Sequence, residues 1–410
     1  MNTKILKQKI LAELLSPAGG GGGWNQNEWE RVKLNEIADI SLGKTLDKQK
    51  NTGIYKPYLR SVNVRWGEID LSDLKEMKFE KSETEKYSLQ YNDLLICEGG
   101  EAGRCAIWKE KEVEMRFQNA LHRVRFQNGN IPEFYMYYLM FLNDTNIIEN
   151  YCKGVTIKHL TGTALRQILF PLPPLPVQKS IVAQIERLFA EIDRIETARQ
   201  ALLNLIKLTK QKTLEIAVSG KWLAVSGTDE WEMVKLGEVC EFIRNGATIK
   251  NNKDAKGFPI TRIETISNGT VDYDRMGYAD IFDISLYERY FLKENDILMS
   301  HINSPIHVGK SALYVPKEKN EVIIHGMNLL CFRLLKIIDA KFLNYYFNSG
   351  YFKEQIKPFI KNAVNQASIN IGNLSGILIP LPPLPVQQQI VEKIDAIFAQ
   401  LEIIEKTINK

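Results

Sequence analysis

Two stretches of the chain carry apolar residues at alternating spacings of four and three positions. The first comprises Ile181, Ile185, Leu188, Ile192 and Ile195 and continues through Leu202; the second comprises Ile390, Ile394, Ile397, Leu401 and Ile404. This spacing predicts an apolar seam on a helix, which requires a partner helix. The first helix would run for roughly 40 residues, or about 60 Å. An amphipathic helix packed on its own globule is the simpler alternative.

Outside these helices, short apolar runs alternate with turn residues. Asp93-Leu-Leu-Ile-Cys and Glu321-Val-Ile-Ile are typical examples, and short helical patterns lie between such runs. Runs of this length bounded by turns indicate strands. We therefore predict two mixed α+β globules, over residues 29–170 and 229–379.

The chain repeats itself in four blocks that keep their order. Trp29-Glu-Arg-Val-Lys-Leu returns as Trp231-Glu-Met-Val-Lys-Leu, and Asn92-Asp-Leu-Leu as Asn295-Asp-Ile-Leu. Gly103-Arg-Cys-Ala-Ile-Trp corresponds to Gly309-Lys-Ser-Ala-Leu-Tyr, and the octapeptide Pro-Leu-Pro-Pro-Leu-Pro-Val-Gln stands at 171–178 and at 380–387. Repetition of this kind indicates one architecture built twice.

The octapeptide is expected to end each globule, because proline cannot donate to a strand ladder and favours an extended exit. A proline-rich ligand for an SH3-like partner is the alternative. It is disfavoured because the same eight residues occupy the same junction twice.

The second helix stops early, and its missing end is found at the other terminus. Lys7-Gln-Lys-Ile-Leu-Ala-Glu-Leu-Leu-Ser matches Lys210-Gln-Lys-Thr-Leu-Glu-Ile-Ala-Val-Ser. We therefore predict a circularly permuted repeat with a pseudo-two-fold axis and a long antiparallel coiled coil. Its domains are a helix with a glycine linker (1–28), globule one (29–170), the central helix (171–228), globule two (229–379) and the final helix (380–410).

Charge and composition restrict the function classes. Lys plus Arg number 53 and Asp plus Glu 49, a net charge of +4, which is low for a protein that holds DNA alone. If DNA is the ligand, other subunits are expected to share the phosphate contacts. No apolar run could span a bilayer, and the N-terminus lacks a signal peptide pattern, so we expect a cytoplasmic protein. The five cysteines have no zinc-ligand spacing and are expected to be reduced.

Catalytic motifs are not found in this sequence. An adenine methyltransferase would need Asn/Asp-Pro-Pro-Tyr/Phe, but the Pro-Pro pairs here stand in Leu-Pro-Pro-Leu. There is no P-loop. We predict no catalytic residue, no metal site and no cofactor bound by this chain.

Taken together, these motifs resemble the specificity subunit of a type I restriction–modification system. The resemblance covers essentially the whole chain, including the octapeptides with the following Gln-Xaa-Xaa-Ile-Val, the Ala217-Val-Ser-Gly-Lys-Trp stretch and the Asn-Asp-Xaa-Leu motif. It implies that each globule reads one half of a split, asymmetric DNA site and that the helices set the distance between the halves. It also implies that each repeat docks a modification subunit, which methylates adenine with S-adenosylmethionine, and that restriction subunits join. The division of the helical repeat between the two termini departs from the commoner layout.

The candidate DNA-contacting residues are polar and basic, and they lie in loops at matched positions of the two repeats. They are Lys44, Thr45, Arg60, Asn63, Arg65, Arg104, Lys153, Lys158 and His159 in globule one, and Arg244, Asn245, Thr248, Lys250, Arg262, His301, Asn303, His307, Lys310, Asn365 and Gln366 in globule two. Donors and acceptors for base edges, with cations for phosphates, are what sequence reading requires. Arg60 and Arg262 could instead be structural, paired with an acid such as Asp70 or Asp272.

Three other readings stay open. A type IIB-like system would use the same subunit with a partner that both methylates and cleaves. A self-contained nuclease or methyltransferase would need its own site; Glu76 and Lys78 behind Asp70 or Asp73 resemble nuclease spacing but have no counterpart in the other half. A structural coiled-coil adaptor would show no sequence preference.

Overall fold

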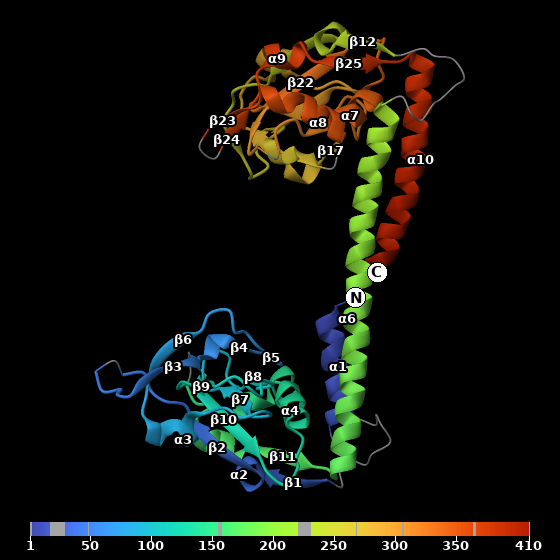
Figure 1. Cartoon of the computed structure of the whole chain (residues 1–410). Helices are drawn as coiled ribbons and strands as arrows, with labels where there is room; N and C mark the ends of the chain where they lie inside the picture. The colour runs from blue at the N-terminus through green and yellow to red at the C-terminus, as the bar shows by residue number, and fades with distance from the viewer. Residues whose placement is uncertain are drawn as a thin grey trace. The chain divides into compact units, whose positions relative to one another are not determined.

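The computed structural model describes residues 2–16, 29–47, 49–154, 158–219, 231–267, 269–305, 307–363 and 366–409. The chain divides into two compact units, Met1–Ala198 and Arg199–Lys410, which contribute different parts of one 44-residue helix, α6 (Leu175–Val218). Each unit joins a globule of mixed strands and helices to helical segments (Figure 1). Among the described residues, no helix combines the length and apolar character needed to cross a bilayer.

Unit 1 contains a four-stranded antiparallel sheet in the order β2-β10-β7-β8 and a three-stranded sheet in the order β6-β3-β9. Their strands are β2 (Ala38–Leu42), β3 (Ile54–Leu59), β6 (Lys75–Phe79), β7 (Leu94–Cys97), β8 (Cys105–Ile107), β9 (Arg116–Phe117) and β10 (Leu121–Phe126). Further elements are α1 (Thr3–Leu15), β1 (Glu30–Lys33), α2 (Leu34–Ile37), η2 (Ser61–Asn63), β4 (Val64–Arg65), β5 (Glu68–Ile69), η3 (Lys81–Glu83), α3 (Thr84–Tyr87), α4 (Pro132–Asp144), η4 (Ile147–Tyr151), α5 (Gly162–Gln167) and β11 (Leu169–Leu172).

Unit 2 repeats this plan with a six-stranded sheet in the order β13-β22-β19-β21-β17-β16. Its strands are β13 (Cys240–Asn245), β16 (Ile266–Ser267), β17 (Gly269–Val271), β19 (Ile297–Ser300), β21 (Ser311–Leu313) and β22 (Leu329–Leu334). Further elements are β12 (Glu232–Lys235), η5 (Leu236–Val239), β14 (Asn251–Asn252), β15 (Phe258–Ile260), η6 (Ile263–Thr265), η7 (Tyr273–Arg275), β18 (Gly277–Ala279), η8 (Ile284–Tyr290), β20 (Ile302–Asn303), α7 (Ala340–Asn348), α8 (Gly350–Ile356), η9 (Lys357–Phe359), β23 (Lys361–Ala363), β24 (Gln366–Ser368), α9 (Ile371–Ser375), β25 (Leu378–Leu381) and α10 (Leu384–Ile408).

The permuted repeat is visible in the cores. In unit 1 the end of α1 contributes Leu11, Leu14 and Leu15 to the main apolar cluster, beside the aromatic side chains of α4. In unit 2 the matching positions at the end of α6, which are Leu214, Ala217 and Val218, join the cluster that contains the aromatic side chains of α7. The N-terminal helix therefore supplies to unit 1 the contacts that the last turns of α6 supply to unit 2.

The first residues of each predicted helical seam are buried, and the last are exposed. Ile181, Ile185, Ile390 and Ile394 are buried, but in the cores of their own globules. Further along, Ile195, Leu202 and Ile404 are 55%, 39% and 43% exposed. Of the remaining seam residues, Ile192 is buried, whereas Leu188, Ile397 and Leu401 are partly buried. Packing on the globule, the simpler alternative, therefore accounts for the first turns of each seam.

Polar contacts join the helices within each unit. Lys210 of α6 pairs with Glu405 of α10 at 3.1 Å, and Arg199 donates to Asn409 at 3.1 Å. Because the lower-numbered α6 residue meets the higher-numbered partner, α10 runs antiparallel to α6. In unit 1, Lys7 of α1 pairs with Asp193 of α6 at 2.7 Å.

The sequence suggested that each globule ends where the octapeptide begins. In the structure, the first two residues of each octapeptide still belong to a strand of the globule. Pro171 lies in β11 opposite Arg31, and Pro380 lies in β25 opposite Met233. Among the described residues each of these ladders has two strands, so a proline nitrogen can face the open edge without breaking a hydrogen bond. α6 and α10 begin four residues later, at Leu175 and Leu384.

The glutamine that closes each octapeptide is fully buried. The Gln178 oxygen accepts from the backbone nitrogen of Ile131 at 3.0 Å, and its nitrogen donates to the Pro173 carbonyl at 3.0 Å. Gln387 accepts from the backbone nitrogen of Asp339 at 2.7 Å and donates to the Pro382 carbonyl at 2.7 Å. Each glutamine thus ties the start of a long helix to the start of the helix packed beside it.

Candidate nucleic-acid interface

The Asn-Asp motif supplies a rigid turn before a buried strand in each unit. Asn92 and Asn295 adopt left-handed backbone conformations, with φ of 72° and 68°. The side chain of Asp93 accepts from the backbone nitrogen of Gln90 and takes two hydrogen bonds from Arg125, both at 2.8 Å. Asp296 takes the matching pair from Arg333 at 2.9 and 2.7 Å. Such two-point contacts fix β7 against β10, and β19 against β22.

The loop that follows this strand is held by a glycine. Gly103 and Gly309 have φ of +87° and +84°, and a Cβ would lie 2.2 Å from Ile148 in unit 1 and 2.4 Å from Ile356 in unit 2. Only glycine meets both conditions without rearrangement. The two loops therefore leave and return at the same places although their side chains differ.

In unit 1 several predicted loops are joined by hydrogen bonds. Asn119 donates to the Thr45 hydroxyl at 3.4 Å, and the Ala120 carbonyl accepts from the backbone nitrogen of Glu98 at 3.0 Å and from the Ser61 hydroxyl at 3.4 Å. Arg104 donates to the Ser61 carbonyl at 2.9 Å. We call residues 43–45, 60–65, 98–104, 118–120 and 158–159 the unit 1 edge.

Unit 2 assembles the corresponding loops in the same way. The backbone nitrogen of Met327 donates to the Ala247 carbonyl at 3.0 Å, and Thr248 donates to the Met327 sulfur at 3.6 Å. β20 pairs with β24 next to His301, whose carbonyl accepts from the backbone nitrogen of Ile369 at 3.0 Å. We call residues 246–250, 262–267, 301–310, 326–328 and 366–368 the unit 2 edge; residue 306 lies outside the described residues.

Some of the predicted contact residues in unit 1 are engaged inside the globule. Lys44 is buried against Glu83 and the Lys78 carbonyl. Asn63 is 2% exposed, and its amide is hydrogen-bonded to the backbone of Arg60, Asp70 and Asp73, so its side chain stabilises this turn. Arg104 also holds this turn, through Ser61.

The other unit 1 candidates reach the surface. Arg60 pairs with Asp73 at 2.7 Å, as its structural alternative anticipated, although with Asp73 rather than Asp70. Arg65 pairs with Asp70 at 3.2 Å and Lys158 with Glu149 at 3.1 Å, both as exposed ion pairs. The exposed residues Thr45, Lys153 and His159 complete the set.

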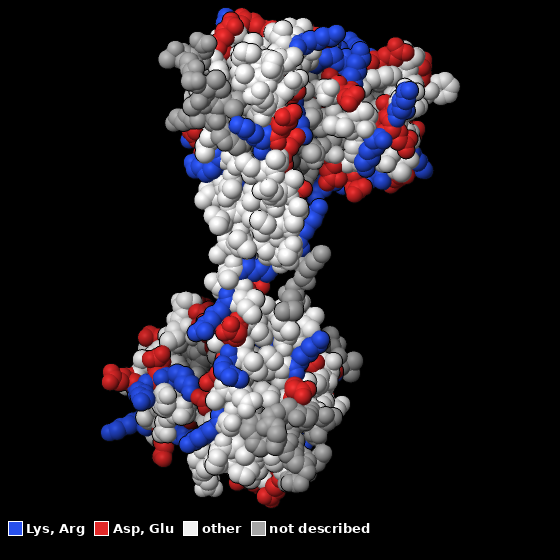
Figure 2. Space-filling model, turned by 90° about the vertical axis from the view of Figure 1, so that its right-hand side faces the viewer, with Lys and Arg blue, Asp and Glu red and all other residues white. Residues whose placement is uncertain are grey.

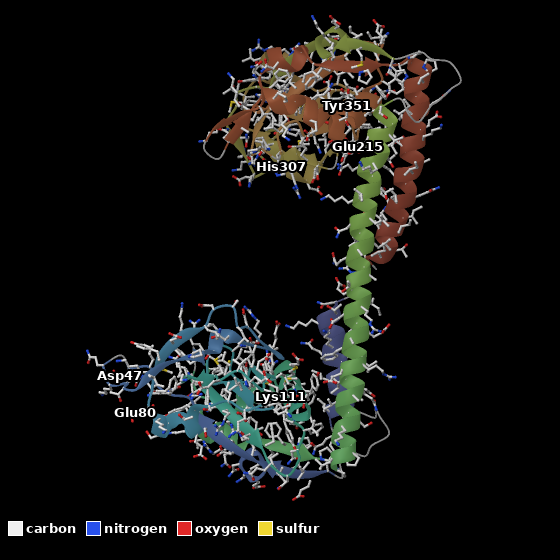
Figure 3. The ribbon with its side chains drawn as sticks, in the orientation of Figure 1. Asp47, Glu80, Lys111, Glu215, His307 and Tyr351 are labelled. Atoms are coloured by element: carbon white, nitrogen blue, oxygen red, sulfur yellow. The ribbon has the colours of Figure 1, made fainter. Side chains whose placement is uncertain are left out.

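In unit 2, one candidate is buried and most are accessible. His301 is 6% exposed, and burial lowers the pKa of its imidazole, which places the ring inside the fold. Arg262 pairs with Glu264 at 3.0 Å rather than with Asp272, and Arg244 stacks on Phe242 and donates to the Arg289 carbonyl. Asn303 and Lys310 are partly exposed; the exposed candidates are Asn245, Thr248, Lys250, His307 (labelled in Figure 3) and Gln366. Asn365 lies outside the described residues.

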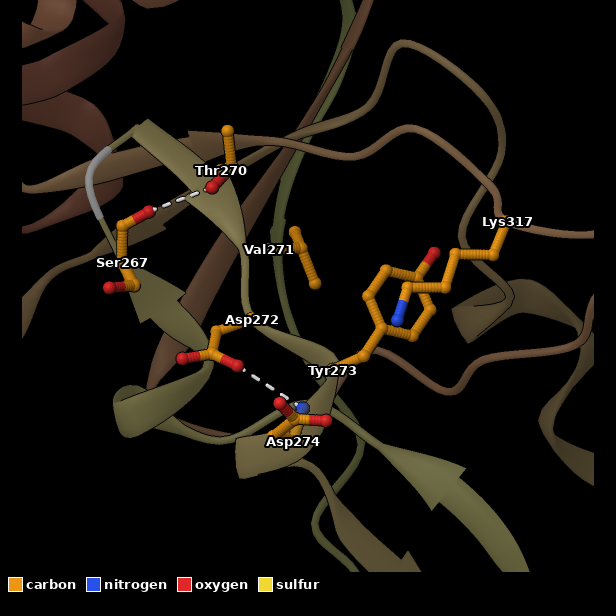
Figure 4. Close-up of a pocket in the computed structure, with 7 residues that line it drawn as sticks. All are labelled: Ser267, Thr270, Val271, Asp272, Tyr273, Asp274 and Lys317. Carbon is orange, nitrogen blue, oxygen red and sulfur yellow. Dashed lines mark hydrogen bonds between the residues drawn. The ribbon is translucent and has the colours of Figure 1, made fainter. Parts of the chain in front are cut away.

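Further polar groups lie on and beside the hairpin β16–β17, and of these the sequence had singled out only Asp272. Ser267, Thr270, Asp272, Asp274 and Lys317 line a shallow pocket of about 290 Å³ beside Tyr273, and Lys317 lies 4.2 Å from the centre of the Tyr273 ring (Figure 4). The matching hairpin of unit 1, β4–β5, carries Arg65. Glu68 stands opposite Arg65, so the same backbone hairpin carries two opposite charges in one unit and hydroxyl groups in the other.

The carboxylates considered for a nuclease are committed to local partners. Hydrogen bonds from Ser72, followed by Arg65, lower the pKa of Asp70 to about 2. Hydrogen bonds from Arg60 and Lys75 lower the pKa of Asp73. Both groups stabilise the turn after β5.

Known proteins share this architecture. The family model for the type I restriction modification DNA specificity domain matches residues 26–205 and 228–410. The chain belongs to this family. Both copies of the domain coincide with the two repeats, and each ends on a long helix.

The chain is similar to type I restriction enzyme specificity subunits, to two of them over most of their length and to a third over less than half of it. The EcoKI specificity subunit of Escherichia coli is 22% identical, with 93% of this chain and 84% of that protein covered. The MjaVIII specificity subunit of Methanocaldococcus jannaschii is 26% identical, with 92% and 88% covered. A putative MjaX specificity subunit of the same organism is 43% identical over 183 residues, which is 44% of this chain and 42% of that protein.

Solved structures share the fold. The HsdS subunit from Thermoanaerobacter tengcongensis has a TM-score of 0.59 at 21% identity, with 94% of this chain and 93% of that chain covered. A chain from a type I restriction–modification complex has a TM-score of 0.66 at 20% identity, with 93% of both chains covered. The two-globule fold with helical repeats is therefore that of the specificity subunits.

Proposed function

We propose that this chain is the DNA-recognition subunit of a type I restriction–modification complex and that each unit reads one half of a split, asymmetric site. The observation that carries the proposal is the pair of edges. Their backbones are tied at matched positions, Asn119 to Lys44 and Met327 to Ala247, both at 3.0 Å, while the exposed side chains differ. A shared frame with unlike donors and acceptors is what two different half-sites require.

Partner subunits complete the function. The net charge of +4 leaves much of the phosphate neutralisation to other chains. Two modification subunits, one on each repeat, would bind S-adenosylmethionine and methylate adenine, and restriction subunits would join them. This chain would act in the cytoplasm without catalysing a step itself.

The helices offer a surface for such partners. Leu205, Leu208 and Ile403 are 56%, 51% and 66% exposed on α6 and α10. Figure 2 shows a broad uncharged surface over the helical part of unit 2. Exposed apolar area of this kind indicates a protein contact.

Methylome sequencing of a host that expresses this chain with its modification subunits tests the proposal. The expected result is one methylated motif made of two unlike half-sites at a fixed gap. A host with a continuous motif, or with no motif that depends on this chain, would refute it.

The same assay tests the helices as a spacer. Insertion of one heptad near Leu202 adds about 10 Å of helix, or roughly three base pairs. The gap between the half-sites should lengthen while both half-sites keep their sequence. Insertion of one heptad in an exposed loop, for example after Lys111, is the matched control and should leave the gap unchanged.

A further inference from the structure

Unit 1 has a short loop before β10, and unit 2 has its counterpart before β22. Each loop is hydrogen-bonded to neighbouring segments of its own edge. We call residues 118–120 and 326–328 the central loops. In unit 1 an isolated β-bridge joins Gln118 to Lys44, in the segment that follows β2. In unit 2 the matching bridge joins Gly326 to Ala247, in the segment that follows β13. No sequence motif marks this loop, so its residues were not among the predicted contacts.

The central loops are held firmly. A Cβ on Gly43 would lie 2.3 Å from the backbone carbon of Gln118, and one on Gly246 would lie 2.1 Å from the carbonyl oxygen of Gly326. Both glycines are therefore needed to let the loop approach. A side chain on such a fixed backbone is preorganised for recognition.

The middle residue of the loop differs between the units. In unit 1 it is Asn119, partly exposed, whose Nδ2 donates to the Thr45 hydroxyl at 3.4 Å. In unit 2 it is Met327, which is 47% exposed, and its sulfur accepts from the Thr248 hydroxyl at 3.6 Å. Matched threonines thus position an amide in one edge and a thioether in the other.

Resting on the proposed function, we infer that the middle residue of the central loop selects a base in each half-site. Asn119 reads adenine: its Oδ1 accepts from the exocyclic amine, and the second hydrogen of Nδ2, left over from the Thr45 contact, is donated to N7. Met327 has no such donor or acceptor pair and contacts the 5-methyl group of thymine.

Base analogues test each contact in the complex of full chain and modification subunits. The probe is a duplex with the target found by methylome sequencing, in which single adenines are replaced by 7-deazaadenine or single thymines by deoxyuridine. For the wild type, one 7-deazaadenine in the half-site of unit 1 should weaken binding about tenfold. One deoxyuridine in the half-site of unit 2 should weaken binding roughly threefold to tenfold.

Variants then assign the effect to a residue. Asn119→Ala should abolish the sensitivity to 7-deazaadenine, and Met327→Ala the sensitivity to deoxyuridine. Each variant keeps the other edge intact, so the remaining sensitivity shows that the complex is folded. Asn119→Asp serves as a second variant and should prefer cytosine at that position, because a carboxylate accepts from the cytosine amine.

Two outcomes would overturn the inference: wild type insensitive to every analogue, or variants as sensitive as the wild type. In both cases a wild-type complex that still prefers its target over a scrambled duplex leaves the proposed function standing. Loss of that preference would refute the proposed function itself.

Discussion

The two globules are built on one frame but place different chemistry on it. Arg125–Asp93 and Arg333–Asp296 occupy the same place, as do Gly103 and Gly309. Elsewhere the strands diverge: the buried Arg123 of β10 has Cys331 as its counterpart in β22. The contacts that maintain the frame therefore recur, whereas both buried residues such as Arg123 and Cys331 and more accessible residues such as Asn119 and Met327 differ between the units.

Removal of a frame carboxylate should have the largest effect. Asp93→Ala leaves Arg125 without its partner, and loss of one member of a buried pair costs about 3–5 kcal/mol. Asp296→Ala should destabilise unit 2 by a similar amount. Chemical unfolding followed by limited proteolysis of each unit measures this. Glu149→Ala, which removes an exposed ion pair with Lys158, is the control and should cost below about 1 kcal/mol.

The permutation predicts equal roles for matched residues of the N-terminal helix α1 and of the end of α6. Leu11 and Leu214 are 2% and 7% exposed at matched positions. Leu11→Ala should destabilise unit 1, and Leu214→Ala unit 2, by about 2–4 kcal/mol each. Hydrogen exchange resolved by unit provides the measurement. If Leu11→Ala leaves hydrogen exchange in globule one unchanged, α1 and the end of α6 are not equivalent.

The frame glycines should tolerate no side chain. Gly103→Ala combines a left-handed conformation with a clash against Ile148, at a cost of about 2 kcal/mol. The double variant Gly103→Ala, Ile148→Val shortens the opposing side chain and should recover part of the loss in thermal stability. Equal melting temperatures for wild type and Gly103→Ala would show that the loop is not constrained as described.

The smallest expected effect is a difference in acid sensitivity. Burial lowers the pKa of His325 to about 4, whereas its counterpart in unit 1 is Phe117. The unfolded chain binds this proton below about pH 6.5, so the contribution of His325 to stability is lost as the pH falls from about 6.5 to 4. His325→Gln should flatten that part of the unfolding curve against pH. An unchanged curve would mean that His325 is not buried in its neutral form.

The sequence predicted the repeat and the long helix, because motifs such as Asn-Asp and the octapeptide recur in order. It could not place the polar side chains, since burial depends on contacts distant in the chain. The sequence pattern places Lys44 in a loop as an exposed cation, but it is buried against Glu83. The Asn63 amide is hydrogen-bonded to the backbone of its own turn. The sequence pattern also did not predict that Gln178 and Gln387 of the octapeptides connect the starts of two neighbouring helices by hydrogen bonds.

Independent reading by the two units is tested most directly by exchanging residues 29–170 for the corresponding globule of another specificity subunit and sequencing the methylome of the host. We expect one half-site to change completely, while the other half-site and the gap between them stay the same. Change in both half-sites, or in neither, would contradict the claim that the two units read DNA independently.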